Sequence, residues 1–278
     1  MALLSIGLQR RTLPGFGLAL GVTLTYLSII VLVPLTALIT RSFDEGFMDW
    51  WHTVTTPRVL ASFRLSFGVS FAAAAVDMVF GTLAAWVLVR YRFPGRRIVD
   101  ALVDLPFALP TAVAGITLTA IYAGNGWLGQ YLEPMGLTVA YTRVGIFVAL
   151  MFVGLPFIVR TVQPVLQDLD AEFEEAAASL GASRWQTFRR VLLPTLLPAL
   201  LTGFTLAFAR AVGEYGSVIF IAGNKPMISE IAPQLIIIKL EEYDYVGAAG
   251  IGTAMLLVSF LVLLVLNGLQ RWARVGHR

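Results

Sequence analysis

Long apolar segments alternate with shorter polar ones along the chain. A helix of about 20 apolar residues crosses a bilayer core of about 30 Å, and about six segments reach that length. The pattern therefore predicts an all-α polytopic membrane protein with about six transmembrane helices. The predicted spans are Gly15–Ile39, Phe63–Val89, Val99–Ala123, Gly145–Val162, Thr195–Ile221 and Val246–Leu269.

Composition agrees with this class and excludes several others. Of the 278 residues, 58% are hydrophobic and 13% are charged, whereas a soluble domain carries about 25% charged residues. The chain has no cysteine and two histidines that lie far apart in sequence, so we predict no metal site. The patterns G-x-x-x-x-G-K-[ST], H-E-x-x-H and G-x-S-x-G are absent. We therefore expect no catalytic residues, and no cofactor bound by this chain.

The longest polar stretch, residues 168–194, separates the fourth and fifth predicted spans. Its sequence predicts two short helices joined by a turn. Gly181 should end the first helix, because glycine accepts left-handed geometry without steric cost. Ser183 and Gln186 fit a capping box for the second helix. Pro194 is then predicted to begin the next span, where its missing N–H matters little.

Arginines gather on one side of the membrane if the predicted spans alternate in direction. Cytoplasmic loops carry an excess of Lys and Arg, so this side is predicted to be cytoplasmic, with both termini and the 168–194 stretch inside. These positions explain the basic residues without a nucleic-acid partner. The arginines are Arg10, Arg11, Arg90, Arg92, Arg96, Arg97, Arg160, Arg184, Arg189, Arg190, Arg271, Arg274 and Arg278.

The charged residues that lie deepest inside predicted spans are Asp77, Arg210 and Glu214. Such residues usually face a bundle interior or a water-filled path. Arg210 and Glu214 are four apart, so they should pair on one helix face. Either this pair only fixes helix packing, or it lines a permeation pathway in which Arg210 attracts an anion. Asp77 has no local partner, so its partner lies on another helix or the carboxyl is protonated.

Two further segments interrupt the simple pattern of spans. Pro106 and Pro110 should bend or break the start of the third span. Such a break either exposes backbone groups to a cavity or serves packing alone. The apolar run Ile231–Leu240 is too short to cross a bilayer. We expect it to form an interfacial or re-entrant helix.

The polar stretch also carries a family resemblance. Glu175–Ala177, Gly181 and Val191–Pro194 follow the pattern E-A-A-x3-G-x9-I-x-L-P, with Val in place of Ile. They resemble the EAA loop of ABC-importer permeases, which is cytoplasmic and docks into a groove on an ATP-hydrolysing subunit. Trp185 and Phe188 would share one helix face and could anchor such a contact. The residues predicted to couple this chain to the ATPase are Glu174, Glu175, Ala176, Ala177, Gly181 and Trp185.

Longer segments resemble one branch of that family, the sulfate/thiosulfate importer permeases of the T (or U) type. They are Tyr91–Arg96, Asp100–Gly115, Pro156–Leu166 and Gly213–Asn224. The resemblance implies a type I ABC importer permease fold in the bacterial inner membrane. It also implies a W-type permease partner, two ATPase subunits that hold ATP and Mg, and a periplasmic sulfate-binding protein.

The resemblance suggests a division of the chain and leaves alternatives open. We expect a first transmembrane helix and periplasmic interfacial segment in residues 1–60. A permease core would follow in residues 61–270, containing the cytoplasmic coupling loop 163–194, and then a cytoplasmic tail in residues 271–278. Since Gly213–Asn224 also resembles molybdate permeases, another oxyanion is an alternative cargo. An ion-gradient-driven transporter and a polytopic membrane enzyme are alternative classes.

Overall fold

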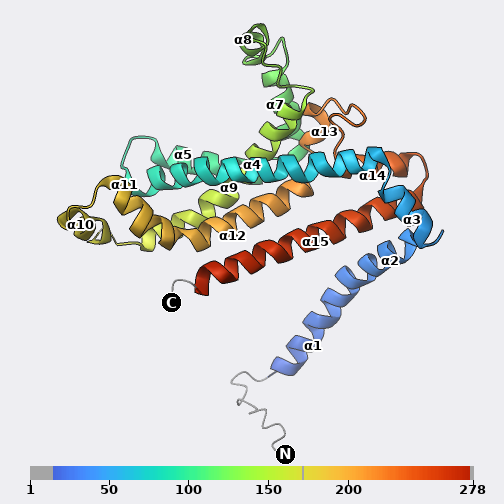
Figure 1. The fold of residues 1–278 in the computed structure, drawn as a ribbon, viewed down its shortest axis with the longest axis horizontal. Helices are drawn as coiled ribbons and strands as arrows, with labels where there is room; N and C mark the ends of the chain where they lie inside the picture. The colour runs from blue at the N-terminus through green and yellow to red at the C-terminus, as the bar shows by residue number, and fades with distance from the viewer. Residues whose placement is uncertain (1–14, 171, 276–278) are drawn as a thin grey trace, which may run out of the picture.

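The computed structural model describes residues 15–170 and 172–275, and every regular element in them is helical (Figure 1). Arg10, Arg11 and Arg278, which were used to predict orientation, lie outside the described residues. The α-helices are α1 (Phe16–Leu27), α2 (Val33–Ser42), α3 (Phe47–Val54), α4 (Pro57–Arg90), α5 (Arg96–Val103), α6 (Leu105–Ala108), α7 (Thr111–Tyr122), α8 (Gly129–Leu132), α9 (Arg143–Asp168), α10 (Glu172–Ser179), α11 (Arg184–Thr187), α12 (Leu193–Val212), α13 (Val218–Ile221), α14 (Ala232–Glu241) and α15 (Tyr245–Val275). Two π-helical turns, η1 (Ser28–Leu32) and η3 (Phe188–Leu192), and one 3₁₀ turn, η2 (Glu133–Met135), complete the set.

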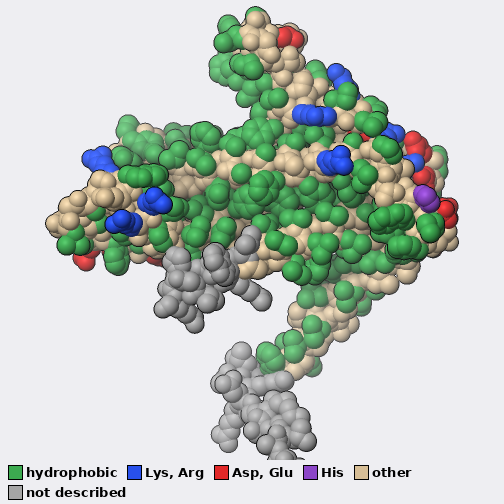
Figure 2. Space-filling model, viewed as in Figure 1, with side chains coloured by type: hydrophobic (Ala, Val, Ile, Leu, Met, Phe, Trp, Pro, Cys, Tyr) green, Lys and Arg blue, Asp and Glu red, His purple; other side chains and the backbone are tan. Residues whose placement is uncertain are grey.

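Five continuous helical segments of the described chain are long and apolar enough to cross a membrane. They are Phe16–Ser42, Pro57–Arg90, Arg143–Asp168, Arg184–Val212 and Tyr245–Gly268. Hydrophobic side chains cover much of the middle of the face drawn in Figure 2, while acidic side chains gather at the end where α3 and α14 lie. The prediction of a multi-pass, all-α membrane protein is therefore confirmed.

The third predicted span, Val99–Ala123, is wrong as a single helix. The chain breaks there into α5, α6 and α7. Leu109 and Pro110 adopt extended backbone, with ψ of 136° and 132°. Proline removes a helical hydrogen bond and disfavours helical geometry in the residue before it. The expected break at Pro106 and Pro110 is thus confirmed, but it divides the segment instead of merely bending it.

The fifth predicted span, Thr195–Ile221, has both boundaries wrong. The helical run begins at Arg184 and continues through the π turn η3 into α12, so Pro194 does not begin it. Proline's ring clashes with the carbonyl of the residue four positions earlier, and the wider π turn contains that residue. Pro34 in the first span follows η1 in the same way. At the other end α12 stops at Val212, and α13 is a separate short helix.

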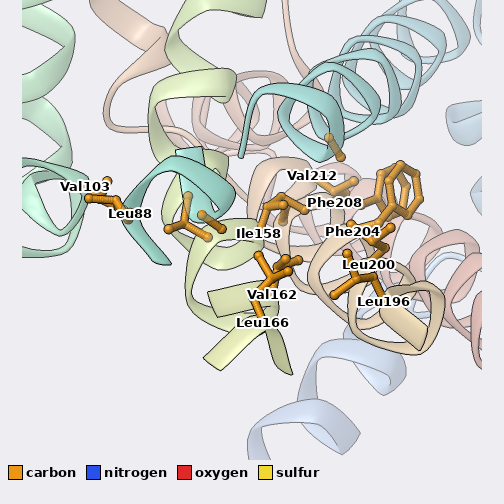
Figure 3. Packing of buried hydrophobic residues seen from close by; sticks show 14 residues of the cluster. Leu88, Val103, Ile158, Val162, Leu166, Leu196, Leu200, Phe204, Phe208 and Val212 are labelled. Atoms are coloured by element: carbon orange, nitrogen blue, oxygen red, sulfur yellow. The ribbon is translucent and has the colours of Figure 1, made fainter. Parts of the chain in front are cut away.

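Helices α4, α9 and α12 form the centre of the bundle and pack mainly on one another. Their buried side chains, together with one from α5, make a continuous core (Figure 3). The backbones of these helices approach closely: a Cβ added at Gly81 of α4 would lie 2.8 Å from Ile158 of α9. Gly203 of α12 similarly leaves room for Thr161. Small residues at helix contacts permit such approach within a bilayer.

The remaining helices surround this centre at its edges and ends. Helix α15 packs against α2, α12 and α14, whereas α1 diverges from the bundle and buries no residue. Helices α7 and α8 project from the side of the bundle, and α10 and α11 lie at one end of the long helices (Figure 1). The apolar run Ile231–Leu240 is helical, as expected: it forms most of α14, which packs against α15 and α4.

Candidate functional site

The connection between α9 and α12 has the predicted two-helix shape. Helix α10 ends before Gly181, whose φ of +79° is the left-handed conformation expected there. Ser183 caps α11: its Oγ accepts from the Gln186 N–H at 3.3 Å, and its own N–H donates to Gln186 Oε1 at 2.8 Å. This is the predicted capping box. We call residues Leu169–Phe188 the elbow.

The elbow exposes a group of apolar and small side chains. Leu180 is 88% exposed and Trp185 is 67% exposed. Glu175 and Ala176 are also exposed, and Ala177 is half-buried. A large exposed apolar surface on a charged, helical connection is characteristic of a protein–protein contact. The elbow thus has the surface expected of a docking element.

Trp185 and Phe188 share one helix face, as predicted. Their rings stack with centroids 5.6 Å apart and planes 24° apart. Phe188 also lines an apolar groove of about 360 Å³ between α4 and α12, while Trp185 points to the surface beside Arg189 and Arg190. The stack orders the exposed indole against Phe188, the last residue of the elbow.

Glu174 differs from the other predicted coupling residues, because it contacts the bundle. Its Oε1 lies 2.8 Å from Nη2 of Arg90, at the end of α4. The same nitrogen donates to the Leu169 carbonyl at 3.1 Å, and the guanidinium lies 5.9 Å from the Trp86 ring centroid. From the sequence, Arg90 served only as one of the arginines that predict the orientation of the chain in the membrane. No local pattern could reveal this contact, since Arg90 and Leu169 are 79 positions apart.

A second arginine, Arg160 of α9, joins α9 to the broken third segment. Its Nε and Nη2 donate to the two carboxylate oxygens of Asp104, at 2.7 and 2.6 Å. Its Nη1 donates to Asp100 Oδ1 and to Gln163 Oε1, at 2.7 and 2.6 Å. A bidentate arginine–carboxylate pair is geometrically specific and strong. Arg160 therefore holds α5 and α6 against α9 where the chain cannot form one continuous helix.

The predicted pairing of Arg210 and Glu214 is confirmed, although the two residues do not lie on one continuous helix. The ion pair crosses the end of α12, which is capped at Gly213. Glu214 is buried, and its Oε1 also accepts from the Ser217 N–H at 2.8 Å and the Ser217 Oγ at 2.9 Å. The carboxylate is therefore fully bonded, while the partly exposed Arg210 side chain keeps positive charge near the surface of the bundle.

Asp77 is buried at the contact of α4, α9 and α12. Neither carboxylate oxygen has a hydrogen-bond partner within residues 15–170 and 172–275, so the expectation of a partner on another helix is not met there. The carboxyl faces Gly154, and a Cβ added at that glycine would contact both Asp77 and, at 3.6 Å, Ala207. Because an isolated buried carboxylate is costly, this environment favours the neutral acid, the alternative considered from sequence.

Comparison with known proteins shows the family to which the chain belongs. Residues 77–274 match the family of binding-protein-dependent transport system inner membrane components. The chain is 52% identical over 253 residues to the sulfate transport system permease protein CysT of Synechocystis, covering 91% of this chain and 88% of the relative. It is 49% identical over 272 residues to the CysT protein of Salmonella typhimurium, covering 97% and 98%.

Solved structures show the same fold at low sequence identity. A bacterial ABC transporter involved in the import of the acidic polysaccharide alginate aligns with a TM-score of 0.76 and 16% identity, over 92% of this chain and 94% of that one. The MetNI methionine ABC transporter aligns with a TM-score of 0.56 and 19% identity, over 77% and 95%. This chain therefore has the type I ABC permease fold and belongs to the family of binding-protein-dependent transport system inner membrane components.

Proposed function

We propose that this chain is a membrane subunit of an ATP-driven importer that carries sulfate or thiosulfate across the bacterial inner membrane. The observation that carries the proposal is the elbow, a protruding pair of helices with exposed Leu180 and Trp185. Its E-A-A pattern resembles the loop by which ABC-importer permeases contact a separate ATPase. The sulfate assignment is supported by relatives, about half identical over nearly the whole chain, that are sulfate permeases.

The proposed partners follow from this role. An ATPase subunit that holds ATP and Mg would bind the elbow through Glu175, Ala176, Ala177, Gly181 and Trp185. The small side chains allow a partner to approach the backbone, and the ordered indole supplies an anchor. A second ATPase copy, a W-type permease and a periplasmic sulfate-binding protein would complete the importer. The solved alginate transporter was captured with a periplasmic protein bound, which supports the expectation of a binding protein.

Orientation and domain organisation form part of the same proposal. The elbow, the end of α4 and α5 lie together at one end of the long helices (Figure 1), and the arginine distribution favours the cytoplasm for that end. Both termini would then be cytoplasmic. Residues 1–60 would form the first helix and periplasmic segment, 61–270 the permease core with its coupling loop at 163–194, and 271–278 the cytoplasmic tail.

Transport would proceed by a two-state switch. ATP binding favours one arrangement of the ATPase pair, and the elbow converts that preference into an inward- or outward-facing bundle. Sulfate is a dianion whose dehydration is costly, so its path should be a wet cavity. Arg210 is the candidate to attract the anion, because Glu214 is already bonded to Ser217 and Arg210 remains partly exposed.

The test is transport by the assembled complex. The chain is co-expressed with candidate ATPase, W-type permease and binding protein, and reconstituted in liposomes. Uptake of radiolabelled sulfate, thiosulfate and molybdate is then measured with and without ATP. ATP-dependent uptake of sulfate or thiosulfate supports the proposal. Preferential uptake of molybdate would show that the substrate is another oxyanion while the chain still belongs to an ATP-driven importer. ATP-independent uptake by the chain alone would contradict an ATP-driven importer and indicate an ion-gradient-driven transporter.

A further inference from the structure

Arg90 occupies a junction of three helical elements. It lies in the last turn of α4, a central helix of the bundle. It reaches the end of α9 through the Leu169 carbonyl and reaches α10 through Glu174. Trp86, one turn earlier on α4, lies beneath the guanidinium. A displacement of α10 relative to the bundle must therefore move or break contacts of this one side chain.

The Arg90–Glu174 ion pair attaches α10 to the bundle. Within the described residues, Arg90–Glu174 is the one ion pair that joins α10 to a helix long enough to cross the membrane. Glu172 and Glu175, the neighbouring acids of α10, are exposed instead. Both charges also complement their helix ends, since Arg90 lies at the negative end of α4 and Glu174 at the positive end of α10.

The pair is partly shielded from solvent. The Arg90 and Glu174 side chains are 21% and 31% exposed, so solvent screens them less than a fully exposed pair. The Nη2–Oε1 distance is 2.8 Å, which is short enough for strong electrostatic attraction.

We propose that Arg90 is a positioning residue that transmits displacement of α10 to α4. This inference rests on the proposed function, because it assumes that an ATPase moves the elbow. The Glu174 carboxylate then faces the bundle and not the ATPase, while Glu175 remains available to the partner. Movement of α10 pulls the end of α4, and α4 passes the movement to α9 and α12 through the shared core.

The experiment is a double-mutant cycle in the full reconstituted complex. The variants Arg90→Gln, Glu174→Gln and the double variant are compared by the amount of sulfate transported per ATP hydrolysed. Each single variant should lower this ratio by about tenfold, while ATP hydrolysis continues. The double variant should be no worse than the more affected single variant, because both changes remove the same ion pair. Arg92→Gln and Glu172→Gln, which alter exposed charges nearby, should leave the ratio unchanged.

The outcomes separate this inference from the proposed function. If the wild-type complex shows no ATP-dependent uptake of any oxyanion, the proposed function fails, and the inference fails with it. If wild-type transport is normal and both single variants keep the wild-type ratio, only the role of Arg90 is overturned. Multiplying effects in the double variant would also overturn it, since the two side chains would then act independently. Should Arg90→Gln fail to accumulate, Glu174→Gln decides alone, because Glu174 lies on the protruding elbow.

Discussion

Two connections between long helices differ in how they are attached to the bundle. The elbow links α9 to α12, and the connection from Gly213 to Asp244 links α12 to α15 through α14. In the second, Arg58 of α4 holds Glu230 with two bonds of 2.8 and 2.7 Å, and Ser66 Oγ accepts from the Ala232 N–H at 2.8 Å. Glu230 is buried, whereas the one ion pair that joins the elbow to the bundle within the described residues, Arg90–Glu174, has partly exposed side chains.

The two connections differ in what their side chains contribute to the fold. The 213–244 connection satisfies its buried charge within the chain and stabilises the fold. The elbow has no comparable buried ion pair among the described residues, and its Leu180 and Trp185 side chains are 88% and 67% exposed. We therefore expect substitutions in the first connection to lower stability, and substitutions in the elbow to lower partner binding or coupling at unchanged stability.

The largest effect is expected when the attached connection is broken. Arg58→Ala leaves the buried Glu230 carboxylate without its counter-charge, so the free energy of unfolding should fall by about 3 kcal/mol. Thermal unfolding in detergent measures this. Asp44→Asn is the matched control, because Asp44 pairs with Arg41 on the exposed surface and such pairs contribute little. Equal effects of both substitutions would contradict the difference between the two connections.

A smaller effect, and of a different kind, is expected for Trp185→Ala. Removal of the exposed indole should weaken association with the ATPase by about 2 kcal/mol, as for an interface anchor, while leaving the unfolding temperature nearly unchanged. Association is measured between the purified chain and the ATPase in detergent. Trp127→Ala, which removes an equally exposed indole beside α8, should not alter it. Loss of stability without loss of binding would mean that Trp185 only packs within the chain.

Gly181→Pro should reduce coupling by about tenfold. Proline holds φ near −65° and cannot adopt the left-handed geometry of Gly181, so α10 and α11 must reorient. Sulfate uptake per ATP hydrolysed is the measurement. Gly181→Asn is the control, because asparagine accepts left-handed backbone and no atom outside the adjacent residues lies within 4 Å of an added Cβ. Normal coupling in the proline variant would show that the turn geometry is not needed.

The smallest effect concerns pH in the attached connection. Burial raises the pKa of Asp244, but the Gly247 N–H and the Lys239 ammonium outweigh it, so this pKa lies below its ordinary value. The resulting stabilisation is present above the unfolded pKa of about 3.9 and is lost as pH falls further. The unfolding temperature should therefore drop slightly more below that pH in the wild type than in Asp244→Asn. An identical acid dependence would contradict the assigned contacts.

The parts predicted from sequence were those governed by neighbouring residues. Gly181 and the Ser183–Gln186 capping box depend on local backbone geometry, and the apolar length of most spans depends on the bilayer. The extent of the break at Pro110 was missed, because the apolar pattern continues through it and only tertiary contacts such as Arg160–Asp104 stabilise the divided segment. Arg58 and Glu230, 172 positions apart, have no local signal at all.

The same distinction between local signals and distant contacts applies to the candidate site. The exposure of Glu175, Ala176 and Trp185 followed from their place on a polar connection. Glu174 could not be distinguished from Glu175 by sequence, because the two differ only in which face of α10 they occupy once Arg90 is nearby. Contacts between distant segments assigned one glutamate to the bundle and left the other to solvent.

The most direct test of the elbow as a docking element is chemical access to its tip. The chain contains no cysteine, so Leu180→Cys introduces a unique thiol at a position that is 88% exposed. A membrane-impermeant maleimide should label this thiol in inverted vesicles but not in intact cells, and the bound ATPase should protect it. Labelling in intact cells, or equal labelling with and without the ATPase, would contradict the account.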